Sequence, residues 1–173
     1  MNILVTGHRG YIGPHLVDLL KAAGHHVTGV DIGYFDACNW EPLPPADKEI
    51  HGDFCSLTER DLQEFDCICH LAVISNDPMG DLDEKLTYDI NRDGSIELAR
   101  RAKKAGVPRF LFSGSCSVYG KGETLDLNEN ARFHPVSGIP AKIQSADRPR
   151  GFQRQPVCAT PFHQEKARGQ MTL

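Results

Sequence analysis

Three glycines near the amino terminus have the spacing of a turn that can bind phosphate. Gly7, Gly10 and Gly13 stand in the segment Gly7-His8-Arg9-Gly10-Tyr11-Ile12-Gly13. Glycine is needed where the backbone takes a positive φ or where a side chain would bar a pyrophosphate, and a helix start presents free N–H groups. The pattern lies between a predicted strand and a predicted helix, so we interpret it as a dinucleotide-binding turn rather than merely a tight one.

A carboxylate and a guanidinium near this turn favour different dinucleotides. Asp31 follows the second apolar stretch, where a carboxylate can accept hydrogen bonds from an adenosine ribose and would repel a 2′-phosphate. Arg9, inside the turn, could attract such a phosphate, although it could equally be a solvent-facing turn residue. Because Asp31 stands where the ribose hydroxyls should lie, we favour NAD over NADP.

The segments that must position these residues alternate between strand and helix patterns. Apolar runs predict strands over 2–6, 26–30, 49–51, 66–72 and 109–113. Helical patterns cover 11–23, with apolar residues at Ile12, Leu16, Leu19 and Leu20, then 57–64 with Ser56 as a candidate cap, and 83–105. This alternation predicts an α/β fold with a Rossmann-like doubly wound parallel sheet, which binds ligands outside the carboxyl ends of its strands.

The composition changes near Gly138. The chain has 173 residues, of which 40% are apolar and 24% charged, as in a globular protein. Residues 1–138 hold 13 Lys and Arg against 21 Asp and Glu, whereas residues 139–173 hold 6 against 2 and most of the glutamines. We therefore expect a truncated nucleotide-binding domain over 1–137 and an irregular, poorly ordered basic tail, rich in Gln and Pro, over 138–173.

Charge, hydropathy and cysteine spacing argue against several other classes. No segment approaches the roughly 18 apolar residues of a membrane span, and the first residues do not read as a signal peptide, which predicts a cytoplasmic protein without membrane contact. The acidic first part argues against nucleic-acid binding. Cys67 and Cys69 would share one face of a strand, where core packing is favoured over a metal site, and no metal is expected elsewhere.

Taken together, the motifs resemble the extended short-chain dehydrogenase/reductase family, in the NAD-dependent epimerase/dehydratase branch that acts on nucleotide sugars. The resemblance covers about residues 1–137. Besides the glycine turn and Asp31, it rests on Gly52-Asp53-Phe54, on His70-Leu71-Ala72, on Asn91 with Gly94, and on the segment 112–120, Phe-Ser-Gly-Ser-Cys-Ser-Val-Tyr-Gly. It implies NAD as cofactor, a nucleotide sugar as substrate, transient hydride transfer, and compatibility with a homo-oligomer.

The resemblance also implies a role for each matching residue. Asp53 would face the adenine edge with Phe54 beside it, Asn91 would brace the active site, and Ser115 would hydrogen-bond the reacting oxygen of the substrate. The alternatives are a turn aspartate at position 53 and an exposed helix asparagine at position 91. The cofactor-binding residues implied in this way are Gly7, Gly10, Tyr11, Ile12, Gly13, Asp31, Asp53, Phe54, Leu71, Ala72, Val73, Asn91 and Ser113.

One part of the family's pattern is missing. Its redox chemistry uses a tyrosine as base with a lysine four residues later, on the same helix face. The residues four positions after Tyr11, Tyr34, Tyr88 and Tyr119 are His15, Cys38, Arg92 and Glu123. Because the family's substrate-binding region is also missing, we expect impaired turnover, and the alternative is a non-catalytic NAD-binding module or an inactive fragment.

Overall fold

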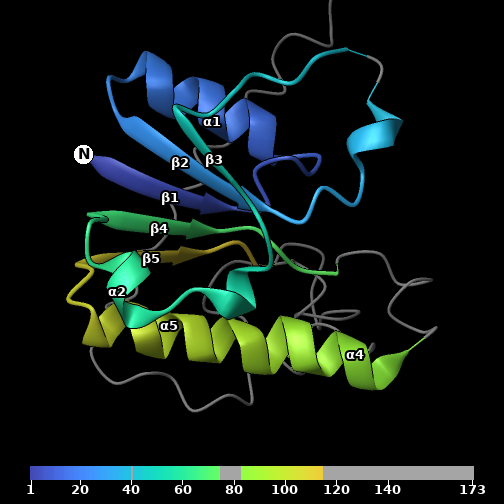
Figure 1. Cartoon of the computed structure of the whole chain (residues 1–173), viewed down its shortest axis with the longest axis vertical. Coiled ribbons are helices and arrows are strands. Elements are labelled where there is room, and N and C mark those ends of the chain that lie inside the picture. Colours follow the sequence, from blue (N-terminus) through green and yellow to red (C-terminus); the bar gives the residue numbers. More distant parts are fainter. Residues whose placement is uncertain (40, 75–82, 115–173) are drawn as a thin grey trace, which may run out of the picture.

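Five parallel strands form a single sheet in the order β3-β2-β1-β4-β5. A computed structural model describes residues 1–39, 41–74 and 83–114 (Figure 1). The strands are β1 (Asn2–Thr6), β2 (His26–Asp31), β3 (Lys48–His51), β4 (Cys67–His70) and β5 (Arg109–Phe112). This order confirms the predicted Rossmann-like fold, and it places the point where the chain reverses direction across the sheet between β1 and β4.

Helices cover both faces of the sheet, as the doubly wound prediction requires (Figure 1). On one face, Ile3 and Val5 of β1 pack with Val17 of helix α1 (Gly13–Ala22). On the other face, Leu4 and Ile68 pack with residues of α2 (Glu59–Leu62) and α5 (Ser95–Lys104). Alternate residues of β1 thus point into two separate cores, which explains why this strand is apolar throughout.

Helix α1 begins two residues later than predicted. Pro14 lies in the first turn of the helix, where a missing N–H costs nothing. Tyr11 and Ile12, which precede the helix, remain in the glycine turn. Two of the apolar residues at helical spacing, Ile12 and Leu19, are exposed. The buried residues are Gly13, Pro14 and Val17, and Leu16 and Leu20 pack against the same core.

Helix α2 is shorter than predicted, and Ser56 is not its cap. Thr58 caps the helix instead: its hydroxyl accepts a hydrogen bond from the Asp61 N–H, while the Asp61 carboxylate accepts one from the Thr58 N–H at 2.8 Å. This reciprocal pair fixes the start of the helix at Glu59. The Ser56 hydroxyl donates to the Asp53 carbonyl within the 3₁₀ turn Phe54–Ser56.

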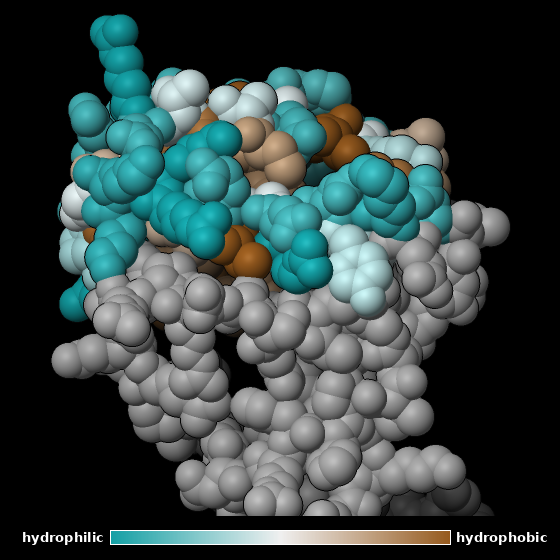
Figure 2. Space-filling view, turned by 90° about the horizontal axis from the view of Figure 1, so that it is seen from below, coloured by the Kyte–Doolittle hydropathy of each residue, from teal (hydrophilic) through white to brown (hydrophobic). Residues whose placement is uncertain are grey.

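The long helix predicted over 83–105 is divided into three parts. Helix α4 (Glu84–Tyr88) leads into a π-helical turn, Asp89–Gly94, and α5 follows it. A π turn adds a residue to the helical repeat and so rotates the side chains that follow it. The inner face of α5 is apolar, whereas its outer side carries basic residues, and Figure 2 shows a largely hydrophilic surface there.

Cys67 and Cys69 both lie in the core on the α1 side of the sheet, as predicted. A hydrogen bond with Cys67, together with burial, raises the pKa of Cys69. Within the described ranges no group of His, Cys, Asp and Glu side chains has the arrangement of a metal site. No helix in the described part of the chain is long and apolar enough to cross a membrane.

Candidate nucleotide-binding site

The glycine turn lies at the carboxyl end of β1, between the ends of its two neighbouring strands. The Gly7 N–H donates to the Val30 carbonyl of β2 at 2.8 Å, and the Leu71 N–H, just after β4, donates to the Thr6 carbonyl at 3.1 Å. Gly7 has a φ of +73°, and a Cβ there would lie 2.8 Å from the Ala72 nitrogen. The backbone of the turn and the segment after β4 therefore pack too closely for any side chain at position 7.

The turn opens directly into the amino terminus of α1. No side chain caps this helix, and Tyr11 is 94% exposed, with Ile12 also exposed. Uncapped first-turn N–H groups and the helix dipole are chemically suited to an anion such as a pyrophosphate. Gly13 is essential to this geometry, because a Cβ there would collide with the carbonyl oxygen of His8.

Asp31 is held in a fixed orientation at the carboxyl end of β2. One carboxylate oxygen accepts a hydrogen bond from the Arg9 N–H at 2.9 Å, and the other accepts one from the Gly33 N–H at 2.8 Å. Each carboxylate oxygen has two acceptor directions, so both can still accept a hydroxyl. Arg9 and Asp31, which are 22 positions apart in the sequence, thus meet at the site. The fixed carboxylate suits recognition of a ribose diol.

The guanidinium of Arg9 is engaged by two carboxylates. Its Nε donates to Asp36 Oδ1 at 2.6 Å, and its Nη1 donates to Glu49 Oε2 at 3.0 Å. Asp36 lies in the loop after β2, and Glu49 lies on β3. The hydrogen bond with Asp36 contributes most to raising the pKa of Arg9 above its usual value. Arg9 therefore ties the glycine turn to the two segments beside it, while its side chain keeps 30% of its surface exposed.

His8 is a site residue that the sequence did not single out. Its side chain is 3% exposed and packs over the backbone of Gly29 in β2, so that a Cβ at position 29 would overlap the imidazole ring. Neither ring nitrogen has a hydrogen-bond partner in the described structure, and Nε2 lies 3.8 Å from Glu49 Oε1. The spacing of the glycines gave no signal for this contact, because Gly29 lies in a different strand.

Asp53 and Phe54 occupy different environments. Asp53 is exposed after β3, accepts a hydrogen bond from the Cys55 N–H at 2.8 Å, and follows Gly52, whose N–H donates to the Asp31 carbonyl. Phe54 is 6% exposed and packs in the core, with its ring centroid 4.7 Å from that of His70. The adenine contacts implied for both residues stay predictions, and the ring of Phe54 has a clear role in the core.

The ends of β4 and β5 carry the remaining predicted cofactor residues. Leu71, Ala72 and Val73 are half-buried immediately after β4, beside the glycine turn. Ser113 is exposed after β5, and its N–H donates to the His70 carbonyl at 3.2 Å. Ser115, the predicted catalytic serine, lies outside the described residues.

Asn91 is buried, so the alternative of an exposed helix asparagine is wrong. It is 1% exposed in the π turn, and its side chain accepts from the Ile74 N–H and donates to the Ile74 carbonyl, both at 2.8 Å. This double hydrogen bond fixes the chain that leaves β4. Asn91 thereby braces the segment next to the glycine turn.

Replacing Asn91 by leucine is expected to destabilise the protein by about 1–3 kcal/mol. The substitution nearly preserves volume but leaves the N–H and carbonyl of Ile74 without partners. Urea unfolding measures the loss, and hydrogen exchange at the Ile74 amide should become faster. Asn39→Leu is the matched control, because the exposed Asn39 makes only two 3.3 Å bonds and its loss should change stability by less than about 0.5 kcal/mol. Equal effects of the two substitutions would contradict the bracing role.

A buried polar network lies beneath the site. His70 is fully buried; its Nδ1 lies 2.6 Å from the Thr6 hydroxyl and its Nε2 lies 2.8 Å from the Ser95 hydroxyl. A neutral imidazole satisfies both, because one nitrogen donates and the other accepts. Burial lowers the pKa of His70 to about 4. This network joins β1, β4 and α5 directly below the segment that follows β4.

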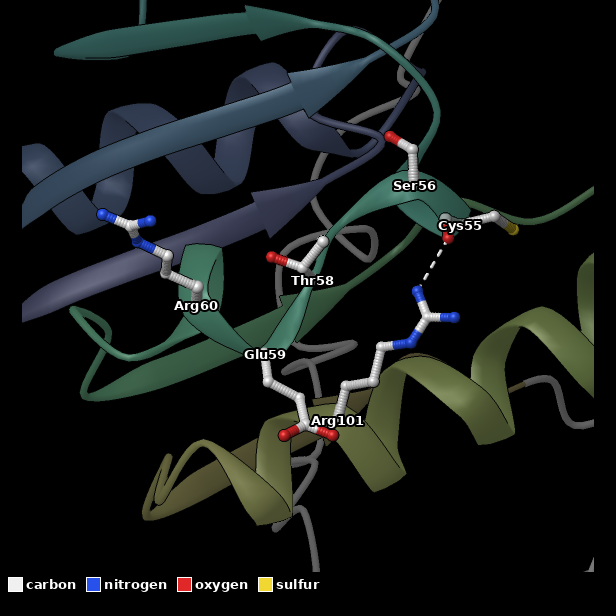
Figure 3. A pocket seen from close by; sticks show the side chains of 6 residues that line it. All are labelled: Cys55, Ser56, Thr58, Glu59, Arg60 and Arg101. Carbon is white, nitrogen blue, oxygen red and sulfur yellow. Dashed lines mark hydrogen bonds between the residues drawn. The ribbon is translucent and has the colours of Figure 1, made fainter.

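The structure also has an open hollow, which lies away from the glycine turn, between α2 and α5. Figure 3 shows its lining residues, Cys55, Ser56, Thr58, Glu59, Arg60 and Arg101. Arg101 Nη1 donates to the carbonyls of Cys55 and Leu57, each at 2.8 Å, so this guanidinium has a structural task. Burial raises the pKa of the Cys55 thiol to about 11, which makes it a poor nucleophile. The hollow contains none of the predicted site residues.

Comparison with known proteins shows the family of the chain. The model of the NAD dependent epimerase/dehydratase family matches residues 3–146. The chain therefore belongs to the NAD dependent epimerase/dehydratase family, which confirms the branch indicated by the motifs. It is similar to the UDP-glucose 4-epimerase of Azospirillum brasilense, with 31% identity over 142 residues that cover 78% of this chain and 39% of the relative.

Solved structures show the same relationship. The NAD-dependent NDP-hexosamine 5,6-dehydratase TunA aligns with a TM-score of 0.75 and 30% identity over 84% of this chain and 47% of TunA. MoeE5, in complex with UDP-glucose and NAD, aligns with a TM-score of 0.72 and 29% identity over 86% of this chain and 47% of MoeE5. The chain thus spans less than half the length of these relatives.

Proposed function

We propose that this chain binds NAD at the carboxyl ends of β1, β2 and β4, and that it provides the nucleotide-binding part of an epimerase or dehydratase acting on a nucleotide sugar. The observation that carries the proposal is the glycine turn, which opens into the uncapped helix α1 beside the fixed carboxylate of Asp31. Family membership and the NAD complex of MoeE5 support the choice of cofactor.

The residues present fit a dinucleotide. The first turn of α1 would receive the pyrophosphate, because its N–H groups lack a side-chain cap and the glycines leave room for close approach. Asp31 would accept the ribose hydroxyls, and its negative charge favours NAD over NADP. Ala72, half-buried next to Gly7, would let the cofactor pass close to the backbone after β4.

The chemistry that a bound NAD would supply here is reversible acceptance of a hydride from the substrate. The described residues of this chain bind and orient the cofactor, and Ser115 would hold the reacting oxygen of the substrate. No lysine follows any tyrosine of the sequence at the spacing that the family's base requires. Because general acid–base catalysis commonly contributes about 10²–10⁴-fold, we expect these 173 residues alone to turn over nucleotide sugars slowly or not at all.

A second candidate function follows from the same observation. A non-catalytic NAD-binding module needs the turn, Asp31 and Asp53, and it does not need the tyrosine–lysine pair. A homo-oligomeric state and a cytoplasmic location stay predictions. Conversion of UDP-glucose to a different nucleotide sugar, followed by chromatography in the presence of NAD, would favour the enzyme over the module.

Calorimetric titration of NAD into the full chain tests the proposal. Asp31→Ala should weaken NAD binding by about tenfold or more, because a charged acceptor for the ribose hydroxyls is lost. Asp47→Ala is the matched control, since Asp47 holds the Val27 N–H at 2.8 Å near the opposite end of β2. The control should bind NAD like the original protein.

Three outcomes would contradict the proposal. One is a folded original chain that gives no saturable heat with NAD. The second is equal weakening by Asp31→Ala and Asp47→Ala, which would indicate a general effect on β2. The third is unchanged binding in Asp31→Ala, which would remove the predicted ribose contact.

A further inference from the structure

Arg9 lies beside the position proposed for the adenosine ribose. Its N–H donates to Asp31 Oδ2, and Asp31 is the residue proposed to accept the ribose hydroxyls. A cation at this place normally draws a dinucleotide that carries a 2′-phosphate, because a guanidinium binds phosphate in a bidentate way. The chain nevertheless has Asp31, which opposes that phosphate. The contacts of the Arg9 side chain show why its positive charge need not attract a 2′-phosphate that Asp31 repels.

Glu49 has a second hydrogen bond, and the backbone before Asp36 turns back toward Arg9. Glu49 Oε1 accepts a hydrogen bond from the Ala46 N–H at 3.3 Å, while its Oε2 accepts from Arg9. Asp36 is brought back toward the turn by Gly33, whose φ is +71°, and a Cβ on Gly33 would lie 2.7 Å from Asp36 Oδ2. The loop after β2 and strand β3 therefore approach Arg9 from two directions. The donors Nε and Nη1 are already occupied.

From this arrangement we infer that Asp36 and Glu49 are specificity-determining residues, which hold Arg9 and so exclude a 2′-phosphorylated cofactor. The inference rests on the proposed binding of NAD. With Asp31, the three carboxylates outnumber the single guanidinium, so the group has a formal charge of −2 when His8 is neutral. A 2′-phosphate would have to approach this negative charge, and it could use only the N–H groups of Arg9 that do not already donate to Asp36 and Glu49. The 2′-hydroxyl of NAD meets neither obstacle.

The double variant Asp36→Asn/Glu49→Gln tests the inference by binding. Titration with NADP should show affinity raised by about tenfold or more, because Arg9 is released and the local charge becomes neutral. Affinity for NAD should change by less than about threefold. Adding Arg9→Ala to the double variant should abolish the gain for NADP. A gain that survives this third substitution would show that charge alone is responsible and would overturn the role assigned to Arg9.

A matched control removes the same charge from a distant place. Glu59 pairs with Lys104 at 3.2 Å and Glu64 pairs with Lys48 at 3.6 Å, near the amino ends of the strands. Glu59→Gln/Glu64→Gln should leave both affinities unchanged. If it raises NADP affinity as much as the test variant does, the effect is one of net charge, and the inference is wrong.

An NMR measurement reports on Arg9 without any nucleotide. The Nε–H of Arg9 should give a distinct, slowly exchanging signal in the original chain and an averaged one in Asp36→Asn. An averaged signal in the original chain would overturn the inference directly. If the original chain binds neither NAD nor NADP, the proposed function fails and this inference with it. If the original chain prefers NAD and the double variant keeps that preference unchanged, only the inference fails.

Discussion

Replacing Gly13 by alanine is expected to weaken NAD binding by about a hundredfold or more and to destabilise the fold. The added Cβ meets the carbonyl oxygens of His8 and Gly7, which are backbone atoms and cannot rotate away. The turn must therefore open, and the first N–H groups of α1 lose the alignment that an anion requires. Overpacking of this kind costs about 1–3 kcal/mol, which would lower Tm by roughly 5–15 °C.

Gly52→Ala is the control for this experiment. A Cβ at Gly52 would have no heavy atom within 4 Å, although the residue also lies in a loop at the carboxyl end of a strand. Calorimetry with NAD and thermal unfolding followed by circular dichroism measure both effects. If the Gly13→Ala variant binds NAD as tightly as the Gly52→Ala variant, the turn does not hold the pyrophosphate.

The second large effect concerns pH. We expect the protein to lose about 3 kcal/mol of stability as the pH falls from about 6.5 to about 4, owing to His70 alone. Burial lowers the pKa of this residue to about 4, compared with about 6.5 when it is unfolded and hydrated. The unfolded state therefore takes up a proton in this range while the folded state does not. The contribution of His70 to the free energy of unfolding is therefore complete above pH 6.5, and it is lost as the pH falls toward 4.

Urea unfolding at several pH values measures this dependence, and His70→Asn should remove most of it. His15→Asn, which changes an exposed histidine of α1, is the control. This variant should keep the dependence of the free energy of unfolding on pH. The pKa can also be read directly, because the ring signals of His70 in NMR should stay those of a neutral imidazole down to about pH 4. Titration of His70 near pH 6.5 in the folded protein would refute the prediction.

The strands could be predicted from the sequence because their signal is local. Runs such as Ile3-Leu4-Val5 are apolar on both faces, as a sheet covered by helices on both sides requires. Their ends agree with the structure to within two residues. The glycine turn and Asp31 were found for the same reason, since a turn between a strand and a helix has its own residue types.

The remaining features depend on contacts between residues that are distant in sequence or on cooperative choices of the backbone. Arg9 meets Asp36 and Glu49 across 27 and 40 residues, and no periodic pattern indicates such a pairing. The π turn at Asp89–Gly94 departs from the regular helical repeat so that Asn91 reaches Ile74. The start of α2 required a choice between Ser56 and Thr58, which Asp61 decided through its reciprocal hydrogen bond.

The packing of His8 over Gly29 constrains how this sequence can change with time. Because any Cβ at position 29 overlaps the imidazole, a mutation there is acceptable only in a chain whose residue 8 has already become small. A substitution at position 29 is therefore expected to displace the imidazole of His8 from its packing against the second strand. The residue types at positions 8 and 29 therefore depend on each other, although the two residues lie in different elements of the fold.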